Sequence, residues 1–244
     1  MNKFYDIKRL PENGTIVLPL SMPKLHGEQS PEEIYKFLGF IEKKIPRISV
    51  DVVFLYTNGL YFNSEQDALS MRIRSTNQML MHMQFLKSII EERYEFVPQA
   101  FHYYPWDYVV LNSPCFSDYM HKLEKSFNND NKFRNYVIYD MYGREPTDAN
   151  VRFILEELAI VHMINERIAP LPSKIADPNG WRLLAYQGPV MLSLAYLYQN
   201  KLLPIKQIND RFSHCHYDAK EKVLVDYQAY QLCDEIFRNL VAVA

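Results

Sequence analysis

Residues 50–57 read VDVVFLYT, a nearly continuous apolar run that is rich in β-branched side chains. Residues 15–20, TIVLPL, form a second run of this kind directly after Asn13 and Gly14. Strands that are apolar on both sides are typical of a parallel sheet whose two faces are covered by helices. We therefore predict that both runs are buried strands.

Helical patterns alternate with these strands. A helix is predicted to begin at Pro31, because Ser30 is a good N-cap and Glu33 can close a capping box. Further helices are predicted over residues 65–93, 113–127, 131–142 and 147–167, from residue 189 onward, and near residues 229–240. Further strands are predicted over residues 108–111, 181–186 and 222–227. The methionines of the helix over residues 65–93 are expected to fill gaps in the core: Met71, Met79, Met81 and Met83.

The alternation predicts an α/β fold, a Rossmann-like parallel sheet flanked by helices and joined by right-handed crossovers. No repeat, low-complexity tract or long linker interrupts the chain, so we predict a single domain over residues 1–244. Ligands of such sheets bind at the carboxyl ends of the strands. Chemistry is therefore expected just after Leu20, Thr57 and Ala185.

Composition argues against several classes of protein. The net charge is −2, so any polyanion must be held by a local basic patch. The sequence has 3 cysteines, whose wide spacing matches neither a disulfide framework nor a zinc site, and His214 and His216 lack an evident third ligand. We therefore expect no metal. The absence of a phosphate-binding loop, a GxGxxG motif and a GxSxG motif disfavours an ATPase, a dehydrogenase and an α/β-hydrolase, and no cofactor is expected. No apolar signal core or membrane-length run is found, so a cytoplasmic location is expected.

Ser21 directly follows the first predicted strand. There its hydroxyl would face the substrate crevice, and it could act as a nucleophile beside a proton acceptor and an oxyanion donor. Alternatively, Ser21 only satisfies backbone groups in the turn before Met22 and Pro23. Its position alone leaves both interpretations open.

Two adjacent glutamates differ in their helical surroundings. Glu156 has Arg152 four residues earlier, which predicts a solvated ion pair. Glu157 has Phe153 four residues earlier and apolar residues three and four positions later, so its carboxylate lies within an apolar stripe. Because an unpaired buried carboxylate is costly, Glu157 must either meet a structural cation or lie in a cavity, where it would suit a substrate ammonium group.

Tyr186 ends the apolar run RLLAY before Gly188. It can pass a proton or bind a substrate by a hydrogen bond, or it can simply pack with its hydroxyl satisfied. The helix over residues 65–93 also carries Arg72, Arg74 and Lys87, which form either ordinary solvated surface or a patch for nucleic-acid phosphates.

Several stretches resemble those of the tRNA-dependent cyclodipeptide synthases. They are TIVLPLS ending at Ser21, SVDVVFLYT, the segment SPCFSDYMHKLEKSFNNDNKFRNYVIYDMYGR, and the pair FILEELAIV and RLLAYQGP. The resemblance covers roughly residues 15–227 and implies a fold similar to the catalytic domain of class I tyrosyl- and tryptophanyl-tRNA synthetases. No HIGH-type or KMSKS-type motif is visible, so ATP-dependent activation of an amino acid is not expected.

Carried over residue by residue, the resemblance makes Ser21 the nucleophile, Glu157 the catalytic glutamate and Tyr186 the tyrosine that follows it. Phe153 then stands at a substrate-binding position where the family has tyrosine, so a hydroxyl that helps to hold the substrate amine is missing. The chain also has Ala159 and Pro19 where the family has proline and glycine, and KLHG at residues 24–27 in place of Asn-Ser-Tyr-Phe.

Apolar residues near the strand ends are expected to line the pocket for the first amino acid: Val17, Pro19, Val53 and Leu184. These walls favour a hydrophobic side chain.

The resemblance implies synthesis of a cyclic dipeptide, a 2,5-diketopiperazine, from two aminoacyl-tRNAs through an aminoacyl-serine intermediate. The implied partners are the two aminoacyl-tRNAs, and Arg72, Arg74 and Lys87 are the residues expected to contact them. Neither DNA nor a membrane is expected as a partner. The chain is expected to be a monomer. Two alternatives stay open: a non-catalytic tRNA- or protein-binding module of the same fold, and a serine acyltransferase or esterase in which a histidine activates Ser21.

Overall fold

The two apolar runs lie side by side in the sheet. β2 (Gly14–Leu20) pairs in parallel with β3 (Val50–Tyr56), from Gly14 opposite Val50 to Leu20 opposite Tyr56. Every residue of both strands is buried, as their composition predicts. The computed structural model describes residues 4–5, 14–43, 50–58, 68–93, 100–169, 171, 180–206, 212 and 214–232.

The described strands form one mixed, mainly parallel sheet in the order β1-β7-β6-β5-β2-β3-β4. The other strands are β1 (Phe4–Tyr5), β4 (Ala100–Pro105), β5 (Trp181–Leu184), β6 (Cys215–Asp218) and β7 (Val223–Asp226). Only the pairs β6–β7 and β1–β7 are antiparallel. Within the sheet, β3 is the neighbour of β2 on one side and β5 is its neighbour on the other side, so the order of the strands changes direction at β2. The carboxyl ends of β2 and β5 therefore mark the switch point where ligands of such sheets bind.

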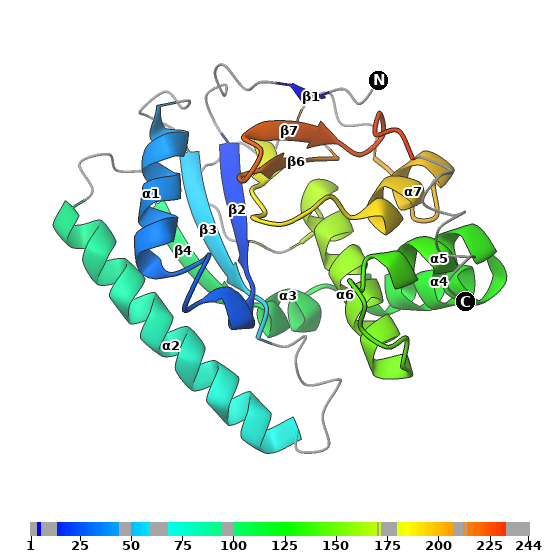
Figure 1. Ribbon diagram of the computed structural model, residues 1–244, viewed down its shortest axis with the longest axis horizontal. Helices are drawn as coiled ribbons and strands as arrows, with labels where there is room; N and C mark the ends of the chain where they lie inside the picture. Colours follow the sequence, from blue (N-terminus) through cyan, green and yellow to red (C-terminus); the bar gives the residue numbers. More distant parts are fainter. Residues whose placement is uncertain are drawn as a thin grey trace.

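Helices cover both faces of the sheet (Figure 1). On one side lie α1 (Pro31–Glu42) and α2 (Ala68–Arg93); on the other lie α4 (Phe116–Asn129), α5 (Asn131–Tyr139), α6 (Asp148–Asn165) and α7 (Leu192–Asn200), with α3 (Trp106–Asn112) at the end of β4. Alternate strand residues face opposite sides, so Val17 packs toward α4–α7 and Ile16 toward α1 and α2. This double burial explains why the strands are apolar throughout.

Local capping signals begin two helices where they were predicted. The Ser30 side chain accepts a hydrogen bond from the Glu33 amide at the start of α1. At the start of α6, the Thr147 side chain accepts one from the Asn150 amide. The helix predicted from residue 189 begins later, at Leu192. Of the helix predicted near residues 229–240, residues 229–232 are not helical and the rest lies outside the described residues.

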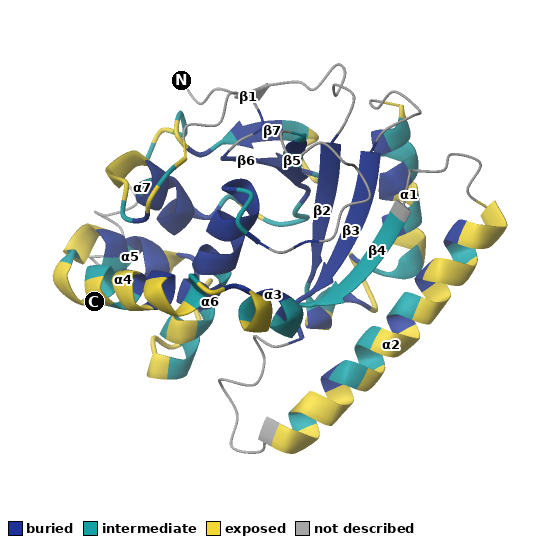
Figure 2. Cartoon of the chain, turned by 180° about the vertical axis from the view of Figure 1, so that it is seen from behind, coloured by how far each residue is buried: buried dark blue, intermediate teal, exposed yellow. Residues whose placement is uncertain are grey.

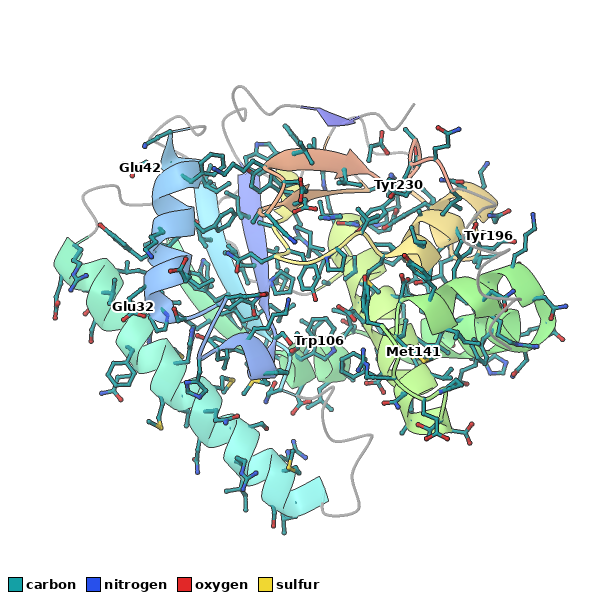
Figure 3. All side chains as sticks on the ribbon, in the orientation of Figure 1. Glu32, Glu42, Trp106, Met141, Tyr196 and Tyr230 are labelled. Carbon is teal, nitrogen blue, oxygen red and sulfur yellow. The ribbon has the colours of Figure 1, made fainter. Side chains whose placement is uncertain are left out.

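The strand predicted over residues 108–111 is wrong. These residues belong to α3, and the strand beside β3 is β4. The side-chain oxygen of Asn58 accepts a hydrogen bond from the Trp106 amide at 3.1 Å, at the start of α3 where β4 ends. Figure 3 labels Trp106. Trp106 and Val109 of α3 are buried in the core, so the helix is part of the tertiary packing at this end of the sheet.

The prediction for the methionines of α2 was wrong for Met81. Met79 and Met83 pack against the core, but Met81 is 57% exposed. Within the described part of the chain, no helix is both long and apolar enough to cross a membrane.

Candidate active site

A pocket of about 500 Å³ opens at the carboxyl ends of the central strands. Ser21 follows β2, Glu157 lies on α6 and Tyr186 follows β5, and all three line this pocket. The other lining residues are Pro23, Lys24, Thr57, Asp140, Tyr142, Arg144, Phe153, Ile154, Pro189 and Met191. Residues far apart in sequence thus face one cavity large enough for an aminoacyl group.

Gln29 holds the backbone around Ser21. Its Oε1 accepts a hydrogen bond from the Ser21 amide at 2.6 Å, and its Nε2 donates to the Pro19 carbonyl at 3.2 Å. The Gln29 side chain is buried, so removing it would leave both backbone groups without their partner. No sequence signal marked this residue, because nothing local distinguishes it from a surface glutamine.

His82 connects this loop to the sheet. Its Nε2 lies 2.8 Å from the Gln29 carbonyl oxygen, and its Nδ1 lies 2.9 Å from the Tyr56 hydroxyl. Because a carbonyl only accepts, Nε2 carries the proton, and Nδ1 accepts from Tyr56. Burial lowers the pKa of His82 and raises the pKa of Tyr56, so both groups are held neutral. The loop after β2 is therefore tied to α2 and β3.

The Glu157 carboxyl is hard to ionise. Burial, reinforced by the nearby Asp140 carboxyl, raises its pKa to about 7, against the opposing effect of Arg144 and Lys24. Some of the side chain remains accessible, which fits its place in the pocket wall. At neutral pH such a carboxyl can both take up and release a proton.

Glu156 differs from its prediction in one respect. The ion pair is confirmed, with Arg152 Nε 3.0 Å from Glu156 Oε1. The prediction that the pair is solvated is wrong for Glu156, whose side chain is only 9% exposed. The apolar contacts of α6 extend further around the helix than its periodicity suggests.

Asp140 is a second carboxyl in the pocket wall that sequence reasoning missed. It accepts hydrogen bonds from the amides of Leu192 at 3.0 Å and Ser193 at 2.8 Å, and from the Ser193 hydroxyl. Burial raises its pKa to about 6, although these three bonds favour the charged form. Asp140 thus caps α7 from the end of another helix, which no local pattern reveals.

The turn after β5 is shaped around Tyr186. A Cβ atom added to Gly188 would lie 2.1 Å from the Tyr186 ring, so only glycine fits with the ring in this position. Lys24 Nζ donates to the Gln187 carbonyl at 3.3 Å and pairs with Glu28 at 3.0 Å. Lys24 therefore connects the Ser21 turn to the Tyr186 turn.

Phe153 forms part of the pocket wall, at a position where it supplies no hydroxyl. The Arg144 guanidinium lies over its ring at 4.7 Å, a cation–π contact. Tyr142, from the same loop as Arg144, also lines the pocket and has a positive φ of 52°. Neither Arg144 nor Tyr142 was predicted to be a site residue.

The remaining predicted site residues do not line this pocket. The predicted pocket walls are buried in their strands: Val17, Pro19, Val53 and Leu184. Of the predicted nucleic-acid contacts, Arg72 pairs with Asp107 at 3.3 Å, Lys87 lies over the Tyr103 ring at 4.9 Å, and Arg74 is exposed on α2.

The two histidines considered as metal ligands have other surroundings. The His214 Nε2 is in hydrogen-bond contact with the carboxyl group of the buried Glu166, and His216 is fully buried beside the Tyr227 ring. Among the residues that the structure describes, no group of three His, Cys, Asp or Glu side chains could hold a metal ion.

No protein-family model and no curated protein matches the sequence. Solved structures do match. A cyclodipeptide synthase from Fluoribacter dumoffii has a TM-score of 0.55 at 13% identity, over 81% of this chain and 88% of that one. A cyclodipeptide synthase from Candidatus Glomeribacter gigasporarum, bound to Phe-tRNAPhe, has a TM-score of 0.50 at 17% identity, over 83% and 91%.

The Mycobacterium tuberculosis cyclodipeptide synthetase has a TM-score of 0.52 at 13% identity, over 84% of this chain and 83% of that one. That structure demonstrates that cyclodipeptide synthetases are related to type I tRNA synthetases. At these identities the likeness shows the fold, and it confirms both the predicted fold class and the resemblance drawn from the sequence.

Proposed function

Because the chain has the fold of the cyclodipeptide synthases, we propose that it joins two aminoacyl groups from aminoacyl-tRNAs into a 2,5-diketopiperazine. One observation carries the proposal. Ser21, Glu157 and Tyr186, which follow or belong to three different elements, line a single pocket at the switch point of the sheet. This set offers a nucleophile and two proton-transfer groups.

In the proposed first step, Ser21 Oγ attacks the ester carbonyl of the first aminoacyl-tRNA. The bond to the tRNA ribose oxygen breaks, the serine proton leaves, and the released tRNA hydroxyl gains a proton. The aminoacyl group is then esterified to Ser21. Tyr186 and Glu157 are the groups proposed to carry these protons, since both face the same pocket.

In the second step, the α-amine of the aminoacyl group on Ser21 attacks the ester of the second aminoacyl-tRNA. This forms a peptide bond, releases the second tRNA and leaves a dipeptide on Ser21. The amine must first lose a proton, and Glu157, with a pKa of about 7, is suited to accept it. The new terminal amine then attacks the Ser21 ester, which closes the ring and returns the serine hydroxyl.

The tRNA substrates would meet cations at two places. Lys24 and Arg144 line the pocket, where the acceptor end must enter. Arg72, Arg74 and Lys87 on α2 are the further candidates for contacts with tRNA phosphates. The Glomeribacter relative is bound to Phe-tRNAPhe, which supports a tRNA partner, and the cytoplasm is accordingly the proposed location.

Two observations weigh on the alternatives. An esterase of the predicted kind needs a histidine beside Ser21, and no lining residue that the structure describes is a histidine. A non-catalytic module of the same fold is favoured by Phe153, which presents a ring covered by Arg144 rather than a hydroxyl. The test must therefore separate turnover from binding.

The test is mass spectrometry of the medium from a bacterial host that expresses the chain, beside hosts that express Ser21→Ala or Ser117→Ala. Ser117 is an exposed serine on α4 and provides a matched control. We expect a new diketopiperazine mass with the unchanged chain and with Ser117→Ala, and none with Ser21→Ala. Its mass would also identify the amino acids.

A second measurement separates an inactive module from an enzyme that lacks its substrate in the host. Purified protein is mixed with a full set of charged tRNAs, and its intact mass is recorded. An added aminoacyl mass that depends on Ser21 supports the proposal. Binding of tRNA without an added mass or product, equal for Ser21→Ala, would overturn it in favour of the module.

A further inference from the structure

α2 carries most of the large apolar side chains that are exposed on the described part of the protein. They are Leu69, Ile73, Leu80, Met81 and Phe85. The helix lies at the edge of the molecule, where its buried face, including Leu86 and Ile90, packs toward α1 and the sheet (Figure 1). Its outer side is largely exposed (Figure 2), and its side chains there project away from the rest of the protein (Figure 3). Apolar side chains concentrated in this way indicate an interaction surface.

Six positions form one continuous stripe along this outer side, which we call the outer seam: Arg74, Gln78, Met81, Phe85, Ser88 and Glu92. Their spacing alternates between four and three residues, the spacing of the contact positions in paired helices. Gln78 is partly exposed and the other five are exposed, Met81 and Phe85 by 57% and 60%. The seam thus has an apolar centre with polar and charged ends.

The order of residue types in the outer seam is self-complementary. The six seam positions are spaced equally on both sides of Met83 along the helix. A two-fold axis that crosses α2 at the level of Met83 would therefore place each seam residue opposite a residue of suitable chemistry in a second copy. In an antiparallel pair, Met81 faces Phe85 of the second copy, and Arg74 faces Glu92 of the second copy. Gln78 and Ser88 face each other between these pairs.

We propose that the outer seam is the contact of a homodimer in which two α2 helices pack antiparallel. Charge complementarity argues for this occupant. Within the described residues, neither Arg74 nor Glu92 has an ion-pair partner, and a second copy supplies one at each end. A parallel pair would place Arg74 against Arg74 and Glu92 against Glu92, so the antiparallel arrangement is the favourable one.

The dimer replaces the monomer expected from the sequence, and it removes Arg74 from the proposed tRNA contacts while Arg72 and Lys87 remain available for them. Arg72 and Lys87 are directed toward Asp107 and Tyr103, on a different side of α2 from the outer seam. One helix from each copy buries less than the roughly 800 Å² per partner of a standard interface, so we expect a weak, concentration-dependent dimer.

Sedimentation of the full chain over a concentration series, at low salt, tests the proposal. Arg74→Glu and Glu92→Arg each create like charges at both ends of the contact, and we expect either to weaken dimerisation about tenfold or more. An equimolar mixture of the two variants restores opposite charges at both ends and should dimerise again. Lys87→Glu, an exposed charge reversal off the seam, should dimerise as the unchanged chain does.

Two outcomes would overturn the proposal. One is a chain that stays monomeric at every concentration; the other is a dimer that the seam variants leave unaffected. If the protein is monomeric and Arg74→Glu weakens tRNA binding while Glu92→Arg strengthens it, the face contacts RNA instead. Restoration by the mixture, together with dimerisation of the unchanged chain, requires the antiparallel arrangement, because a parallel pair of unchanged chains would bring like charges together at both ends.

Discussion

The Glu157 carboxyl should make the protein less stable as the pH rises. Its pKa is about 7 in the folded protein, against an ordinary value of 4.5. Between these values the folded state holds more protons than the unfolded state, so the free energy of unfolding falls as the pH rises from about 4.5 to about 7. A shift of this size corresponds to roughly 3–4 kcal/mol, and the partial exposure of Glu157 to the pocket reduces it.

Glu157→Gln removes this titration while keeping the shape of the side chain. We expect the variant to be more stable than the unchanged chain above about pH 7, by about 1–3 kcal/mol, with the difference shrinking toward about pH 4.5. Urea unfolding followed by circular dichroism at a series of pH values measures the difference. Glu145→Gln, at an exposed position beside the pocket loop, is the control for loss of a charge and should show no comparable trend.

The same carboxyl predicts the pH dependence of turnover. If Glu157 accepts the proton of the substrate ammonium, product formation should rise with pH through about 7, and Glu157→Gln should be nearly inactive despite its stability. A variant that is less stable than the unchanged chain above pH 7, or a difference that does not vary with pH, would refute the reasoning. The carboxylate would then be held by a structural partner.

Three further substitutions test how the pocket is built. Gly188→Ala should lower activity about 100-fold, because the added Cβ would displace the Tyr186 ring; product assays measure this. Gln29→Leu should cost about 2 kcal/mol in unfolding free energy and also reduce activity, because two backbone groups beside the nucleophile lose their buried partner. Asp140→Ala should cost about 2 kcal/mol through loss of the α7 cap, measurable by thermal or urea unfolding.

Controls make these three outcomes specific. Gly39→Ala on α1 has open space around its new Cβ and should keep activity while raising stability by about 1 kcal/mol. An active Gly188→Ala variant would mean that the turn can shift without moving the ring. A Gln29→Leu or Asp140→Ala variant as stable as the unchanged chain would show that water replaces the lost side chain.

Much of the fold could be predicted from periodicity. The runs at residues 15–20 and 50–57 are apolar on both faces, and this identified them as strands of a covered parallel sheet. The capping residues Ser30 and Thr147 likewise marked the starts of α1 and α6. Such signals are local, because a residue's neighbours in sequence are also its neighbours in a strand or a helix turn.

The candidate site could be predicted only in part. Ser21 and Tyr186 were found because they follow strands, and Glu157 because a carboxylate within an apolar stripe must meet a partner or a cavity. Their roles in chemistry stay predictions. The pocket walls expected at Val17 and Val53 show the limit of this reasoning, since strand residues there pack into the core rather than the pocket.

By itself, the sequence determined that residues 15–20 and 50–57 are buried strands of a covered parallel sheet and that helices begin after Ser30 and Thr147. Only the tertiary structure decided that residues 108–111 belong to a helix whose first amide is bonded to Asn58, and that Gln29 and Asp140 hold the backbone around the pocket. The physical reason is that each of these bonds joins segments distant in the chain. Their partners are defined only when the elements pack together, so no periodicity along the sequence records them.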